Sequence, residues 1–169
     1  MQQVKATVLQ GHRVASGQAL PGMDQRFNQD GGTIALQIPE FRKRGLDFDE
    51  YFGGKAGEIY IVGTLGCDVA PFTIAIGHPE YHFMDVRWTD KLDKEIPGFK
   101  ENFFLSPAKV EFGGKSYKAL LYIPDPATKL AHLQRPSTIE VIAEKVPNIR
   151  YGDSVTLFYN PEAIKLEAK

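Results

Sequence analysis

Several features are scarce in this chain, and each absence narrows what the protein can be. The 169 residues include a single cysteine, Cys67, so no internal disulfide can form, and we expect a reducing, cytoplasmic setting. The longest apolar runs, such as Leu120–Ile123, are far shorter than the roughly 20 residues that a membrane-spanning helix requires. The first residues lack the apolar core of a secretory signal peptide. We therefore expect no membrane partner.

Charge of one sign is not in excess either. The formal net charge is −1 and the pI is about 6.4. Lysines and arginines are spread along the chain, apart from the short run at 42–44. Proteins that bind nucleic acid usually carry a continuous basic surface, because most of their affinity comes from phosphate contacts. We therefore expect no nucleic-acid partner.

Familiar catalytic motifs are missing as well. The sequence has no Gly-x-x-x-x-Gly-Lys-Ser/Thr loop, no Gly-x-Gly-x-x-Gly and no Gly-x-Ser-x-Gly. Cys67 has no neighbouring cation that would lower the pKa of its thiol, which favours a buried structural cysteine. His78 and His82 would share a face on a helix, as in zinc proteases, but Pro79 opposes that helix and makes a metal site the weaker interpretation.

What the sequence does contain is a series of short strand-like segments. Runs of β-branched and aromatic residues bounded by turn residues predict strands at 4–9, 33–38, 58–62, 72–76, 81–88, 108–112, 116–123, 138–143 and 154–159. In the segment 81–88, we expect the core face to carry His82, Met84, Val86 and Trp88. Gly113-Gly114 and residues 151–153 predict tight turns, because glycine adopts positive φ without steric cost.

Evidence for helices is limited. Residues 39–44 predict one short helix with Pro39 at or near its first turn and Gly45 as its end. Further helical turns are expected at 48–52, 144–149 and 161–166. Many short strands with few helices predict a mostly β protein, as a closed or nearly closed β-barrel, with a β-sandwich as the alternative. We expect one domain over residues 1–169, with an inserted or elaborated segment at about 71–100.

Two glycine-containing loops offer candidate chemistry. Residues 11–17 place Gly11, Ser16 and Gly17 just after the first strand, where backbone N–H groups could approach an anion, although an ordinary turn has the same composition. Residues 63–68 place the hydroxyl of Thr64 and the carboxylate of Asp68 between two strands. Such oxygen atoms are suitable Mg²⁺ ligands, whereas a plain strand exit with a glycine bend is the structural alternative.

Taken in order, several segments resemble the archaeal CTP-dependent riboflavin kinases, which are small cradle-loop β-barrels. Residues 32–41 resemble the strand and helix entry after the nucleotide loop of that family. Gly63-Thr64-Leu65-Gly66 resembles the family's Gly-Thr-Leu-Asn motif, and residues 138–143 with 151–155 resemble its two C-terminal motifs. The resemblance implies a six-stranded, riboflavin-kinase-like barrel.

The resemblance also implies roles for individual residues. Glu140 corresponds to the flavin-contacting glutamate and is the candidate catalytic base. Thr64 corresponds to a Mg²⁺-binding threonine, whereas Gly66 stands in place of the second ligand, an asparagine. Asp68 is the candidate substitute for that ligand.

The remaining expected contacts surround the two substrates. Thr128 and His132 are expected near the flavin phosphate. The nucleotide loop corresponds loosely either to Gly11, Ser16 and Gly17 or to the stretch that ends at Gly32. The implied activity is Mg²⁺-dependent transfer of a phosphoryl group from CTP or another nucleotide to riboflavin, giving FMN.

Two other functions remain open at this point. The missing asparagine favours a catalytically inactive module that binds a flavin or a nucleotide. The third possibility is a protein-interaction domain that uses an edge strand or the segment 71–100.

Overall fold

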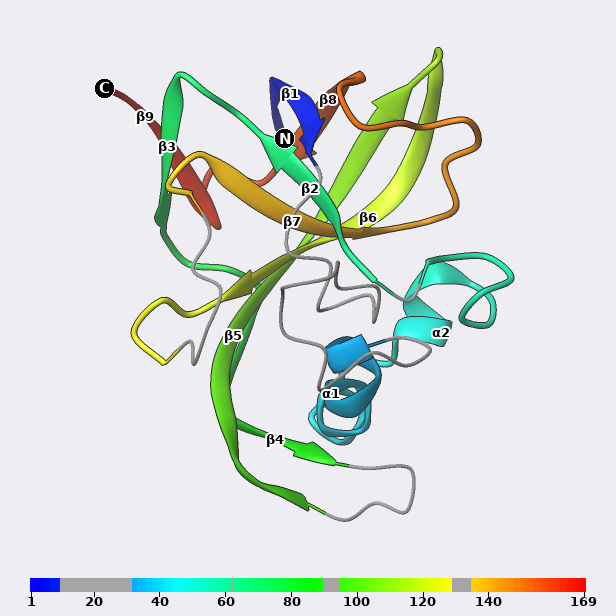
Figure 1. The fold of residues 1–169 in the computed structure, drawn as a ribbon, viewed down its shortest axis with the longest axis vertical. Coiled ribbons are helices and arrows are strands. Elements are labelled where there is room, and N and C mark those ends of the chain that lie inside the picture. The colour runs from blue at the N-terminus through cyan, green and yellow to red at the C-terminus, as the bar shows by residue number, and fades with distance from the viewer. Residues whose placement is uncertain (10–31, 62, 90–94, 129–134) are drawn as a thin grey trace, which may run out of the picture.

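The structure is a computed structural model that describes residues 1–9, 32–61, 63–89, 95–128 and 135–169 (Figure 1). The described residues form two helices, α1 (Gly32–Lys43) and α2 (Phe48–Phe52). The same residues also form the strands β1 (Gln2–Leu9), β2 (Leu65–Asp68), β3 (Phe72–Ile76), β4 (Tyr81–Thr89), β5 (Glu95–Phe112), β6 (Lys115–Pro124), β7 (Thr138–Ala143), β8 (Ser154–Tyr159) and β9 (Ile164–Ala168). No helix among them is long and apolar enough to cross a membrane.

Six strands close into an antiparallel barrel. Their order is β5-β6-β7-β2-β1-β8, and β8 pairs back onto β5 through Lys109↔Phe158 and Val110↔Leu157. Closure pairs both edges of every strand in the ring, which a sandwich does not do. The expected mostly β barrel is therefore confirmed.

The remaining strands lie outside this ring. β5 is 18 residues long and continues beyond the barrel, where β4 pairs with it (Figure 1). β3 and β9 form a separate two-stranded sheet with Ile74 opposite Leu166. The segment at about 71–100 thus adds β3, β4 and the first part of β5 to the barrel.

Alternation of side chains along the strands produces two hydrophobic cores. One fills the barrel and includes Val8, Cys67, Leu121, Val141 and Leu157. The intervening positions of β5, β6 and β7 face outward, and they pack against α1, α2 and β4 in the second core, which includes Phe41, Phe83, Leu105, Leu120 and Ile142. The outer face of β5–β7 is therefore covered rather than open to solvent.

Helix α1 shows that the strand expected at 33–38 is wrong. Ile34, Gln37 and Phe41 are buried at spacings of three and four residues, which is one face of a helix. The ring of Phe41 packs against Phe83 and Phe103, with centroids 5.1 and 5.6 Å apart. Packing against the barrel therefore overrides the strand propensity of the β-branched residues. Pro39 lies inside this helix rather than at its start.

Three further local expectations are also wrong. Around Tyr60 there is no strand, only isolated bridges to Ala56 and Glu144. Residues 144–149 form no helix, and the helix expected at 161–166 is replaced by β9, whose pairing with β3 fixes an extended backbone. The bridge from Tyr60 to Glu144 and the pairing of β9 with β3 both join residues distant in sequence, and local sequence patterns do not contain such pairings.

The expected core face of β4 is only partly right. Val86 and Trp88 are buried as expected, but His82 and Met84 are exposed and Phe83 is buried instead. The pairing of β4 with β5 shifts after Phe83, because β4 contains one extra residue there. A β-bulge inverts the alternation of side chains, so Phe83 before the bulge and Val86 after it both point into the second core, although regular alternation would place them on opposite faces.

The two predicted turns are confirmed. Gly113 and Gly114 have φ values of 59° and 77°, as a type I′ hairpin turn requires. Gly152 has φ 91°, and Asp153 accepts the N–H of Arg150 at 2.8 Å. These turns fix the register of β6 and the start of β8.

Candidate functional site

Thr64 and Glu140 lie together on the outer side of the barrel. The Thr64 Oγ1 donates a hydrogen bond of 3.0 Å to the Glu140 Oε1. The two residues are 76 positions apart, and the antiparallel pairing of β2 with β7, which places Gly66 opposite Glu140, brings them together. A hydroxyl that donates its proton to a carboxylate keeps its lone pairs free for a cation.

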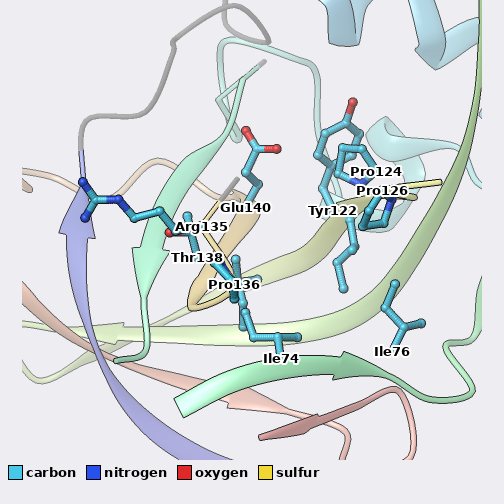
Figure 2. Close-up of a pocket in the computed structure, with 11 residues that line it drawn as sticks. Ile74, Ile76, Tyr122, Pro124, Pro126, Arg135, Pro136, Thr138 and Glu140 are labelled. Atoms are coloured by element: carbon cyan, nitrogen blue, oxygen red, sulfur yellow. The ribbon is translucent and has the colours of Figure 1, made fainter. Parts of the chain in front are cut away.

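A pocket of about 140 Å³ opens beside Glu140 (Figure 2). Its walls come from β3, from the end of β6, from the connection between β6 and β7, and from the start of β7. The lining residues are Ile74, Ile76, Tyr122, Ile123, Pro124, Pro126, Arg135, Pro136, Thr138, Ile139 and Glu140. Figure 2 shows Ile74 and Ile76 on the β3 side and Glu140 on the opposite side. Pockets for whole small molecules usually exceed roughly 300 Å³, so this one suits part of a ligand.

Most of the pocket wall is apolar, and its polar groups are few. The rigid rings of the prolines and the apolar side chains of the isoleucines suit contact with an apolar ring system. Thr138 and Glu140 add a hydroxyl and a carboxylate on the outward face of β7. Arg135 precedes this strand and is exposed, and Figure 2 shows its guanidinium directed away from Glu140. The arrangement can bind a molecule with one apolar ring and a few hydrogen-bonding groups at its edge.

Tyr122 connects the pocket with α1. Its hydroxyl donates a 2.6 Å hydrogen bond to the Gln37 Oε1, and both side chains are buried. Burial raises the pKa of Tyr122 well above its ordinary value, and the charges of Glu140 and Glu101 raise it further. The phenol therefore stays protonated and cannot act as a general base at neutral pH.

Gly66 is the residue that the sequence resemblance places opposite the asparagine ligand of the riboflavin kinases. It pairs with Leu9 of β1, and a Cβ atom at this position would lie 3.1 Å from the Leu9 carbonyl oxygen. Such a contact is tighter than most Cβ contacts in proteins. The close approach of β1 to β2 thus leaves little room for an asparagine side chain here.

Asp68 is not brought next to Thr64. It lies at the far end of β2, about 10 Å beyond Leu65 at the usual rise of a strand. Its Oδ1 accepts the N–H of Ala70 at 3.1 Å, which is a local turn contact. Asp68 therefore takes no part in the pair formed by Thr64 and Glu140.

The donor atoms allow a limited test of Mg²⁺ binding. Within the ranges that the structure describes, no group of three or more His, Cys, Asp or Glu side chains could hold a metal ion. Thr64 and Glu140 offer two oxygen ligands of the kind that Mg²⁺ prefers. Such a set fits an ion that takes its other ligands from water and from phosphate.

The other expected site residues are placed as follows. Gly32 is the first residue of α1. Thr128 lies in the turn after β6, next to the pocket wall, where its Oγ1 accepts the N–H of Asn102 at 2.9 Å. Gly11, Ser16, Gly17 and His132 lie outside the described residues.

The weaker candidates have structural partners. Glu80, the carboxylate between His78 and His82, accepts hydrogen bonds from Ser106 and, at 2.7 Å, from Asn160. His82 is exposed and stacks on Phe104, with ring centroids 4.3 Å apart. Cys67 is buried in the barrel core, and burial raises the pKa of its thiol to about 12, so it is no nucleophile at neutral pH.

Sequence reasoning did not identify most of the pocket wall. Ile74, Ile76 and Tyr122 looked like ordinary core positions of strands, and their place at the pocket depends on how β3 lies against the barrel. The closely spaced prolines before and after residues 129–134 were the one available signal, because they stiffen a connection. Neither protein-family models nor curated protein sequences give a match to this chain. The class is therefore defined by the fold and pocket: a closed antiparallel β-barrel with a small, mostly apolar pocket on its outer side.

Proposed function

We propose that this protein binds a riboflavin-like molecule in the pocket beside Glu140 and transfers a phosphoryl group from a nucleotide to its primary hydroxyl. The hydrogen bond between Thr64 and Glu140 carries the proposal. The resemblance to archaeal CTP-dependent riboflavin kinases assigns a metal-binding role to the first residue and a flavin contact to the second. Two residues distant in sequence with complementary roles lie side by side, which supports a common site.

The pocket chemistry also supports a flavin. The apolar face formed by Ile74, Ile76 and Pro124 suits one edge of a planar ring system. The remainder of such a ligand would extend out of the pocket, past Glu140, because the hollow is smaller than a whole flavin. The ribityl hydroxyls would then lie near the carboxylate.

The chemical step needs one proton acceptor at the attacking oxygen. Glu140 takes the proton of the primary hydroxyl while the new P–O bond forms and the bond from the terminal phosphorus to the bridging oxygen breaks. The nucleotide leaves as its diphosphate. Thr64 holds the carboxylate in one orientation through its hydrogen bond. A bound Mg²⁺ would neutralise phosphate charge in this reaction.

A binding module without catalysis is the second candidate. Gly66 stands where the family has a metal ligand, and Asp68 lies too far along β2 to replace it. With fewer protein ligands, the site could still bind a flavin while holding Mg²⁺ and nucleotide too weakly for transfer.

The experiment is a flavin titration followed by a turnover assay. Quenching of riboflavin fluorescence is measured with and without Mg²⁺, and then CTP or ATP is added and FMN is separated by chromatography. Glu140→Gln should retain flavin binding but lower FMN formation by about 100-fold or more, as expected for loss of a general base. Thr64→Val should lower both the rate and its dependence on Mg²⁺.

Matched controls and outcomes separate the candidates. Glu167→Gln and Thr73→Val change the same residue types at positions of the β3–β9 sheet that do not line the pocket, and they should leave the assay unchanged. Riboflavin binding without FMN from either nucleotide selects the binding module. A wild-type protein that does not quench riboflavin contradicts both candidates, and turnover that survives both site variants refutes the residue assignments.

A further inference from the structure

One residue of β5 holds the turn that forms part of the pocket wall. This turn follows β6, and it carries Pro126 of the pocket lining. The backbone carbonyl of Asn102 accepts the N–H of Asp125 at 2.9 Å. The backbone N–H of Asn102 donates to the Thr128 Oγ1, also at 2.9 Å. Both ends of the turn are therefore bound to Asn102.

The turn is also closed by its own hydrogen bonds. The Asp125 Oδ1 accepts the N–H of Ala127 at 2.9 Å, and the Asp125 carbonyl accepts the N–H of Thr128 at 3.0 Å. These local bonds make residues 125–128 a compact unit. Such a unit moves as one body when its anchor at Asn102 moves.

The side chain of Asn102 points to a different part of the fold. Its Oδ1 accepts the N–H of Asp85 at 2.8 Å. Asp85 lies in the β4 bulge and has φ 51°, a left-handed conformation that non-glycine residues seldom adopt. Arg44, which follows α1, donates to the carbonyls of Met84 and of Asp85, the second at 3.2 Å. Two side chains thus satisfy the backbone groups that the bulge removes from the ladder.

We propose that Asn102 is a positioning residue that couples the β4 bulge and the end of α1 to the pocket wall. The affinity of the pocket for its ligand then depends on residues that do not touch the ligand, Arg44 among them. The effect on ligand affinity rests on the proposed function, whereas the mechanical coupling does not. The path is physical, because Arg44, the bulge, Asn102 and the turn form one chain of hydrogen bonds.

Amide hydrogen exchange on the ligand-free protein tests the coupling. Arg44→Met and Asn102→Ala should each raise exchange about tenfold or more at Asp85 and in the turn 125–128. The first removes the donor to the bulge carbonyls and the second removes the acceptor of the Asp85 N–H, so the bulge no longer holds the Asn102 backbone that binds the turn. Arg42→Met is the matched control, because Arg42 is an exposed arginine of α1 that pairs with Asp47, whereas Arg44 donates to the bulge. It should leave exchange in the turn at the wild-type rate.

A riboflavin titration of the same variants completes the experiment. Asn102→Ala should weaken flavin binding about tenfold, whereas Asn102→Asp, which keeps an acceptor for the Asp85 N–H, should bind within about threefold of wild type. Equal loss in both variants overturns the role of the acceptor. Faster exchange at Asp85 with an unchanged turn overturns the coupling. Coupled exchange in a protein that binds no riboflavin supports the coupling and rejects the proposed function.

Discussion

The Tyr122 hydroxyl and the Gln37 side-chain oxygen, 85 residues apart, form a buried hydrogen bond of 2.6 Å between the barrel and α1. Tyr122 belongs to the outward face of β6, and Gln37 belongs to the helix that covers this face. Two polar groups that would each be costly to bury alone satisfy one another. The bond therefore fixes how α1 lies on the barrel, next to the pocket.

Replacing this phenol should destabilise the fold measurably. Tyr122→Phe removes the donor but leaves the Gln37 oxygen buried, so the free energy of unfolding should fall by about 1–3 kcal/mol. Urea denaturation followed by circular dichroism measures the change. Tyr151→Phe, at an exposed tyrosine, is the control and should change stability by less than about 0.5 kcal/mol. An equally small loss in Tyr122→Phe would show that Gln37 finds another donor.

Cys67 should make stability fall in alkaline solution. Burial raises the pKa of its thiol to about 12, so the folded protein keeps a proton that the unfolded chain loses near pH 9. Stability is therefore highest below that pH and should be about 1 kcal/mol lower at pH 10 than at pH 8. Denaturation at both values measures the difference, and Cys67→Ala should reduce it. A thiol reagent that modifies the folded protein as fast as the unfolded chain would contradict the burial of this side chain.

Protonation of Glu80 should lower the stability of the fold in acidic solution. Burial raises the pKa of its carboxyl, but hydrogen bonds from Ser106, from Asn160 and from the backbone outweigh burial and lower the pKa below its ordinary value. The contribution of the Glu80 carboxylate to the free energy of unfolding is therefore present above the ordinary carboxyl pKa. It is lost as the pH falls through the lowered pKa. Thermal midpoints between pH 7 and pH 3 should fall less steeply for Glu80→Gln than for wild type. Glu162→Gln, in the neighbouring exposed turn, should reproduce the wild-type slope.

The barrel was predictable because its strands carry their own local signals. Segments such as 138–143 and the Gly113-Gly114 hairpin were identified within a residue or so, since alternation and turn chemistry are local. Helix α1 was not, because the β-branched residues around Ile34 favour a strand until the second core selects a helical face. The bulge at Asp85 was also invisible, since it depends on a partner strand and on Arg44.

The candidate site likewise contains residues that the sequence could identify and residues that only the folded structure reveals. Glu140 and Thr64 were named through a family resemblance, and the register of β2 and β7 brings them together. Asp68 was chosen for its carboxylate alone, and the length of β2 carries it away from Thr64. Ile74 and Ile76 had no chemical signal, because a pocket wall is made by the meeting of distant segments.

Gly66 allows a direct test of whether an asparagine side chain, as in the riboflavin kinases that the sequence resembles, would fit at this position. Gly66→Asn introduces that side chain, but its Cβ would press on the Leu9 carbonyl oxygen at 3.1 Å, and strand pairing restricts how far Leu9 can move. We expect the free energy of unfolding to fall by about 1–3 kcal/mol, with no gain in Mg²⁺-dependent riboflavin binding. Gly66→Ala, which adds the same Cβ without the amide, should lose a similar amount. A stable Gly66→Asn protein with stronger Mg²⁺-dependent binding would show that the approach of β1 does not exclude the ligand.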